Sequence, residues 1–81
     1  MPGAAYIGST DTRGDTKNNG SSDVFVNGLG VVRQGDLDTR GDSMTSFSST
    51  VFANGKKVCR INDQDSRGDT IISGSSDVII G

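Results

Sequence analysis

The sequence predicts an all-β protein in which three 27-residue repeats close about a pseudo-threefold axis. An Asp-Thr-Arg-Gly-Asp segment at 11–15 returns at 38–42 and, as Asp-Ser-Arg-Gly-Asp, at 65–69. Short β-branched runs recur with the same spacing, and no window shows the i, i+3, i+4 pattern of an amphipathic helix. Tandem units without spacers or end caps favour closure into a ring. We therefore expect a single domain, 1–81, with repeats at approximately 1–27, 28–54 and 55–81.

Strands are expected in the apolar runs, because valine, isoleucine and phenylalanine favour extended backbone. These runs are 24–26, 31–32, 51–52, 71–72 and 78–80. Asn-Gly pairs at 27–28 and 54–55 predict hairpin turns, since both residues accept positive φ. Gly-Ser-Ser at 20–22 and 74–76 predicts a bend in a continuing strand, with Phe47 in place of the glycine in the middle repeat.

Chain direction limits how these turns are arranged. Repeats related by rotation must all start in the same direction, so each unit contains an even number of chain reversals. The Asn-Gly pair and the Asp-rich segment are the two strongest reversal signals in each unit. The Asn-Gly turns are therefore expected at one end of the body and the Arg-Gly-Asp loops at the other.

Side chains alternate between the two faces of each expected strand. Phe25, Phe52 and Ile79 point one way, and their neighbours point the other way: Val24, Val26, Val51, Ala53, Val78 and Ile80. Both sets are apolar, which leaves two interpretations open. Either one set fills the core while the other packs beneath a neighbouring segment, or part of this surface is a docking patch.

Composition excludes several classes of function. The net charge of −2 gives no basic surface for nucleic acid. A single cysteine, Cys59, excludes an intrachain disulfide, and no apolar run is long enough to span a membrane. The residues at 1–5 lack the charged and apolar regions of a signal peptide, so any export is expected to use another route.

Four segments, in this order and spacing, resemble the PAAR-repeat proteins. Residues 30–36 and 58–63 follow the Asn-Gly turns, 51–56 contains one, and 70–75 precedes another strand. The Pro-Ala-Ala-Arg position of that family is occupied by Gly3-Ala4-Ala5-Tyr6, Gly30-Val31-Val32-Arg33 and Lys57-Val58-Cys59-Arg60. The resemblance covers the whole chain and implies a small three-sided β pyramid or cone.

The resemblance also implies a structural function rather than an enzymatic one. PAAR-like proteins form the point of the trimeric spike in phage tails and type VI secretion systems. The implied partner is a trimeric spike protein that binds one copy per trimer, with the chain a monomer in isolation. The implied place is the tip of a virion tail or baseplate, or secretion by a type VI system, with transient contact with a target-cell outer membrane during piercing. The residues that bind the spike are not assigned by the sequence.

The zinc site of the family has no counterpart in this sequence. PAAR-like proteins usually bind zinc through histidines and a cysteine, whereas this chain has no histidine. Arg13, Arg40 and Arg67 stand where the family's histidine falls, and Cys59 lies in the Pro-Ala-Ala-Arg strand. We therefore expect neither a metal nor a cofactor.

The Asp-x-Arg-Gly-Asp loops are expected to form the apex. Their nine charged residues are Asp11, Arg13, Asp15, Asp38, Arg40, Asp42, Asp65, Arg67 and Asp69. Three alternatives remain open for them: an ionic ring of arginines held by either set of aspartates, independently solvated charges, or a hard cation held by aspartate oxygens. The cation is disfavoured by the nearby arginines and by Ser9, which stands where the other repeats carry Asp36 and Asp63.

Other functions receive weaker support. Arg-Gly-Asp is also an integrin adhesion tripeptide, but here its recurrence follows from the repeat. No histidine base is present for catalysis. The structural alternative is a β-solenoid-like surface-binding or adhesion module, which would present flat rows of threonine or aromatic residues instead of these charged rows.

Overall fold

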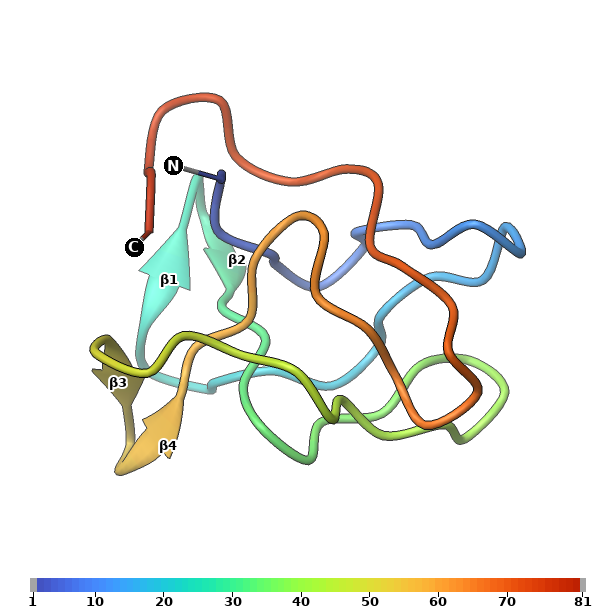
Figure 1. Ribbon diagram of the computed structural model, residues 1–81. Coiled ribbons are helices and arrows are strands. Elements are labelled where there is room, and N and C mark those ends of the chain that lie inside the picture. The colour runs from blue at the N-terminus through green and yellow to red at the C-terminus, as the bar shows by residue number, and fades with distance from the viewer. Residues whose placement is uncertain (1, 81) are drawn as a thin grey trace.

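The computed structural model describes residues 2–80, and this part of the chain contains strands but no helix. The four strands are β1 (Phe25–Val26), β2 (Leu29–Gly30), β3 (Phe52–Ala53) and β4 (Lys56–Lys57), which form two antiparallel hairpins (Figure 1). The all-β class is therefore confirmed. None of the described residues belongs to a helix that could cross a membrane.

Both hairpins turn at the Asn-Gly pairs, as predicted. In the first hairpin Val26 pairs with Leu29, and the two residues between them, Asn27 and Gly28, have φ angles of 53° and 80°. The second hairpin repeats this geometry at 54–55, with φ angles of 56° and 76°. Positive φ at both central positions matches the right-handed twist of the flanking strands.

Most of the remaining apolar runs form single bridges instead of strands. The predicted strands at 31–32, 71–72 and 78–80 were wrong, since only Val31, Ile71 and Ile79 of these runs make β-pairs. The cause is that the chain changes its pairing partner after one residue. The backbone N–H of Val31 donates to Val24, for example, while that of the next residue, Val32, donates to Ala5.

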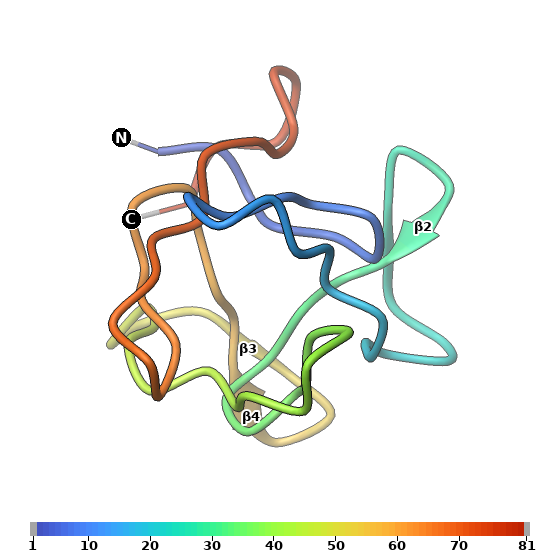
Figure 2. The ribbon, with the colours of Figure 1, turned by 90° about the vertical axis from the view of Figure 1, so that its right-hand side faces the viewer.

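The bridges link the repeats in a closed cycle. Tyr6 pairs with Val31, and the same pair 27 residues later joins Arg33 to Val58. A third pair, between Arg60 and Ala4, returns from the last repeat to the first. Figure 2, which looks onto the Arg-Gly-Asp end, shows the three parts of the chain arranged around a common centre.

A triangle of backbone hydrogen bonds lies at this centre. The N–H of Ala5 donates to the carbonyl of Cys59 at 3.0 Å, that of Val32 to Ala5 at 3.0 Å, and that of Cys59 to Val32 at 2.9 Å. Each residue is therefore both donor and acceptor, and all three are fully buried. Satisfying these groups is necessary because an unpaired buried backbone group costs about 1–3 kcal/mol.

Two apolar clusters make up the core. One contains Ala4, Val26, Val31, Ala53, Val58 and Ile80, and the other contains Ala5, Val32, Met44, Cys59 and Ile71. Consecutive residues such as Val31 and Val32 belong to different clusters. The described body has nearly equal extents of 24 × 23 × 22 Å, which do not distinguish a pyramid from a sphere. The pyramidal shape and the division into three equivalent repeats remain predictions.

The two ends of the body differ in chemistry. The hairpins and the described residues near the termini lie at the left of Figure 1, and the Arg-Gly-Asp loops lie at the right. Phe25, Phe52 and Ile79, on the hairpin side, are 59%, 55% and 48% exposed, whereas Val26, Ala53 and Ile80 are buried. The Phe25 set is thus not packed beneath a neighbouring segment.

Candidate functional site

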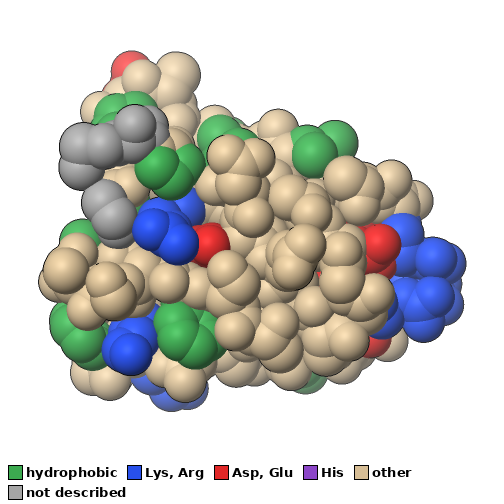
Figure 3. Space-filling model, in the orientation of Figure 1, with side chains coloured by type: hydrophobic (Ala, Val, Ile, Leu, Met, Phe, Trp, Pro, Cys, Tyr) green, Lys and Arg blue, Asp and Glu red, His purple; other side chains and the backbone are tan. Residues whose placement is uncertain are grey.

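The three Arg-Gly-Asp loops form the most highly charged surface of the described chain. Each loop is closed by one β-pair: Thr10 with Thr16, Leu37 with Ser43, and Gln64 with Thr70. The loops are joined to one another by backbone hydrogen bonds of 2.8–3.0 Å, from 12 to 70, from 39 to 16 and from 66 to 43. Basic side chains gather over the loops at the right of Figure 3, with acidic side chains among them. Residues 58 positions apart in the sequence, 12 and 70, therefore lie side by side.

The first aspartate of each loop organises the loop from within. Oδ1 of Asp11 accepts hydrogen bonds from the backbone N–H of Arg13 at 2.9 Å and of Asp15 at 3.0 Å. The same pair of bonds recurs at Asp38 and at Asp65. This Asx-type turn leaves the second oxygen, Oδ2, free to bind another group.

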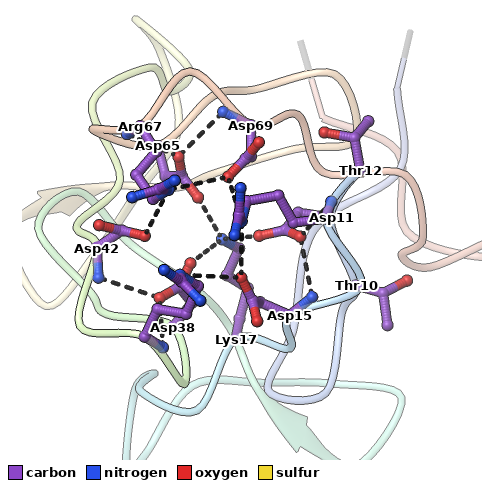
Figure 4. A network of polar contacts seen from close by, with 12 residues as sticks. Thr10, Asp11, Thr12, Asp15, Lys17, Asp38, Asp42, Asp65, Arg67 and Asp69 are labelled. Carbon is purple, nitrogen blue, oxygen red and sulfur yellow. Dashed lines mark hydrogen bonds and ion pairs between the residues drawn. The ribbon is translucent and has the colours of Figure 1, made fainter.

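That group is the ammonium of Lys17. Its Nζ lies 3.3 Å from Oδ2 of Asp11, 3.3 Å from Oδ2 of Asp38 and 3.1 Å from Oδ2 of Asp65 (Figure 4). All four side chains are fully buried. An ammonium has three N–H donors, so each carboxylate receives one of them. We call these four residues the lysine cluster.

Lys17 occupies a repeat position that is otherwise apolar. Met44 and Ile71 hold the corresponding places in the second and third repeats, and both are buried in the core. Lys17 was not among the residues predicted for the site. The available signal was a single lysine at a position where the other two repeats carry large apolar side chains.

The arginines pair with the second aspartate of the loops and not with the first. Their contacts join Arg13 to Asp15 and Asp69, Arg40 to Asp15, and Arg67 to Asp42 and Asp69, at 3.7–3.8 Å. These distances are too long for hydrogen bonds. The arginine side chains are 40–44% exposed and the aspartates 16–20%, so each pair contributes about 0–1 kcal/mol.

Charge in the loops is not balanced. Six aspartates face four cations, and Oδ2 of Asp15, Asp42 and Asp69 is buried without a hydrogen-bond partner. Burial raises the pKa of Asp69, and the negative charges of Asp65 and Asp11 raise it further against the opposing effect of the arginines. The outer layer of the loops is thus held less firmly than the lysine cluster.

In the second and third repeats, an arginine–aspartate pair outside the loop stabilises the turn that precedes the loop. Arg33 donates to Oδ2 of Asp36 at 2.9 Å and Arg60 to Oδ2 of Asp63 at 2.9 Å, each through Nε. Burial opposes the charged form of Asp63, but hydrogen bonds from Arg60 and Ser46 outweigh burial and lower its pKa. In the first repeat the Ser9 hydroxyl accepts the equivalent backbone N–H, so no charge pair is needed there.

The lysine cluster and Cys59 do not fit zinc. The carboxylates of Asp11, Asp38 and Asp65 are close enough together to hold a metal ion, but the Lys17 ammonium lies between them. Cys59 is buried in the apolar core, where burial and then the charges of Asp63 and Asp36 raise the pKa of its thiol to about 12. A thiol that stays protonated is a poor metal ligand.

Replacing Lys17 by methionine should destabilise the protein far more than replacing one loop arginine. Lys17→Met strands three buried carboxylates, which is expected to cost about 3–5 kcal/mol, whereas Arg40→Ala should cost about 0–1 kcal/mol. Urea denaturation at pH 7 measures both, with Lys56→Met as the control for an exposed lysine. Equal losses for Lys17→Met and Arg40→Ala would contradict the assignment.

Stability should depend on pH at both extremes. Burial opposes the charged form of Lys17, but its hydrogen bonds to Asp65, Asp11 and Asp38 outweigh burial and raise its pKa above 10.5. Burial also opposes the charged form of Asp38, but hydrogen bonds from the backbone N–H groups of Asp42 and Arg40, and then from Lys17, outweigh it and lower the pKa of Asp38 below 3.8. The stability from Lys17 is therefore lost above pH 10.5, and that from Asp38 below pH 3.8.

Asp69 acts in the opposite sense. Its raised pKa means that the charged carboxylate destabilises the folded state, and acidification toward pH 4 should return some stability. Urea midpoints measured from pH 3 to pH 11 should hold or rise slightly as the pH falls from 7 toward 3.8, and should fall below pH 3.8 and above pH 10.5. The Asp69→Asn variant should lack the rise, and a steady fall that starts near pH 6 would be inconsistent with these shifts.

Comparison with known proteins identifies the family. A search of curated proteins finds no match. The family model for the PAAR motif matches residues 7–73, which include all three Arg-Gly-Asp loops and both hairpins. Because this match covers well over half of the sequence, the chain belongs to the PAAR-motif family.

Proposed function

We propose that this protein is the tip of the central spike of a contractile injection machine, where one copy caps a trimeric spike protein. Membership of the PAAR-motif family supports this role. The cyclic pairing of the repeats supports it independently, because a body with three similar sides can meet a threefold partner without symmetry mismatch. The proposed place is the tip of a phage tail baseplate or of a type VI secretion spike.

The hairpin end is the proposed docking surface. Phe25, Phe52 and Ile79 occupy the same repeat position and remain about half exposed, with Val24, Leu29 and Val78 exposed on the same segments. Apolar groups gathered in this way on a small protein indicate a surface that a partner covers. A blunt threefold spike end can contact all three sides of this surface at once, which makes it the occupant that we propose.

The opposite end is suited to contact with the target surface. It is polar, its loops are tied together by backbone hydrogen bonds, and the lysine cluster anchors them from inside. Adhesion through the Arg-Gly-Asp tripeptide is disfavoured by the same geometry. Asp15, Asp42 and Asp69 are mostly buried and face arginines of their own or neighbouring loops.

Binding to a spike trimer tests the proposal. Light scattering of a mixture with a trimeric spike protein from the same genome should give the mass of the trimer plus one 8.4 kDa chain, and the free chain should be monomeric. Phe25→Ser combined with Phe52→Ser should lower the affinity at least about tenfold, because it removes aromatic anchors.

The matched control is Ile72→Ser. Ile72 is 57% exposed but its backbone bonds to Thr10 beside the loops, away from the hairpins. This variant should bind like the native protein. A stable homotrimer of the chain, three copies per spike, or equal losses from the phenylalanine and isoleucine changes would refute the proposed docking.

A further inference from the structure

The position of Lys17 suggests a role beyond ordinary stabilisation. We propose that its ammonium is a built-in cation that takes the place of a metal ion at the centre of the three loops. The tip would then assemble without metal, whether or not it caps a spike. Three features of Lys17 point to this role: its geometry, its burial and its repeat position.

The three carboxylates form a site of the size that a metal ion needs. One oxygen from each of Asp11, Asp38 and Asp65 lies within 4.8 Å of the others. Three oxygens bound to one calcium ion at about 2.4 Å can lie about 4 Å apart. The donors are hard carboxylate oxygens, which favour Ca²⁺, Mg²⁺ or Mn²⁺ over zinc. The lysine cluster is therefore a carboxylate cation site whose cation is part of the chain.

Lys17 and a metal ion exclude each other. The Nζ atom lies 3.1–3.3 Å from all three oxygens and caps the triangle that they form, so an ion bound to the same three oxygens would collide with it. The ammonium also carries a positive charge, which repels another cation at so short a distance. All the side chains involved are fully buried, which leaves no room for the lysine to turn aside within the site.

The repeat explains why one lysine is enough. The three carboxylates surround a single central position, and one ammonium satisfies them with its three donors. Met44 and Ile71 fill the equivalent positions in the other repeats. A trimer of identical chains would have to place three lysines at the same point, where their charges would repel. Fusion of the repeats in one chain lets a single repeat differ from the others.

The decisive comparison is between the native protein and Lys17→Met. This variant places methionine at position 17, the residue type that the second repeat has at the equivalent position, 44. The native protein should keep its melting temperature, within about 1 °C, in EDTA and in millimolar CaCl2 or MnCl2. Lys17→Met should melt lower in EDTA and gain about 5 °C or more with CaCl2 or MnCl2. Titration calorimetry with MnCl2 should give one ion per Lys17→Met chain and no binding to the native chain.

Two further proteins separate this role from general packing. Lys56→Met removes an exposed lysine and should behave like the native protein. Lys17→Met combined with Asp65→Asn should lose the stabilisation by metal, because one of the three carboxylates is gone. A Lys17→Met protein that melts like the native one in EDTA, or that gains nothing from any of these ions, would overturn the proposal.

The native protein gives a test that does not depend on whether Lys17→Met folds. Protein purified without chelator should contain less than about one tenth of a metal ion per chain by elemental analysis, and EDTA should leave its unfolding unchanged. One ion per chain, or destabilisation by EDTA, would show that a metal is present after all. Either result would overturn the assignment of Lys17 as the resident cation.

Discussion

Three buried carboxylates require a positive charge, and the arrangement of the Arg-Gly-Asp loops depends on how this chain supplies it. Asp11, Asp38 and Asp65 come from different repeats, and each uses one oxygen to hold its own loop and the other to bind Lys17. Removing water from such groups is costly, so a cluster of this kind forms only when each charged group has hydrogen-bond partners and the carboxylates share a cation. One side chain thereby fixes the positions of three loops relative to one another.

The rest of the molecule forms layers around the lysine cluster. Below it, Met44 and Ile71 belong to an apolar cluster that surrounds the backbone triangle of Ala5, Val32 and Cys59. Above it, the arginines and the second aspartates form a looser, partly exposed layer. The strength of the contacts therefore falls from the centre of the loops outward. This gradient suits the tip role proposed above, in which the outer surface would meet water or lipid while the interior stays fixed.

Some of this could be predicted from the sequence, because the signals were local or periodic. Asn27-Gly28 and Asn54-Gly55 gave the hairpin turns, since few residue pairs accept positive φ twice. The recurring Asp-x-Arg-Gly-Asp segments marked the charged loops. The strands at 31–32, 71–72 and 78–80 could not be placed, because composition shows that a residue is extended but not how often its partner changes.

The chemistry of the loops was predicted only in part. Arginine, with its planar fork, was the expected partner for the aspartates. The first aspartate of each loop, however, uses Oδ1 within its own loop and has only Oδ2 left for another partner. A compact ammonium with three donors fits that geometry better than a guanidinium. Lys17 carried no motif, and its meaning becomes clear only when the repeats are superimposed and one charged residue falls at an apolar position.

The most direct measurement is the NMR signal of the Lys17 ammonium in uniformly 15N-labelled protein. At neutral pH and 25 °C an exposed lysine such as Lys56 exchanges its ammonium protons with water too fast to give a sharp signal. A buried ammonium with three hydrogen bonds should give one slowly exchanging NH3+ cross-peak that is absent from Lys17→Met. If no protected NH3+ signal is seen, or if the signal persists without Lys17, then the loops are not organised around this cation.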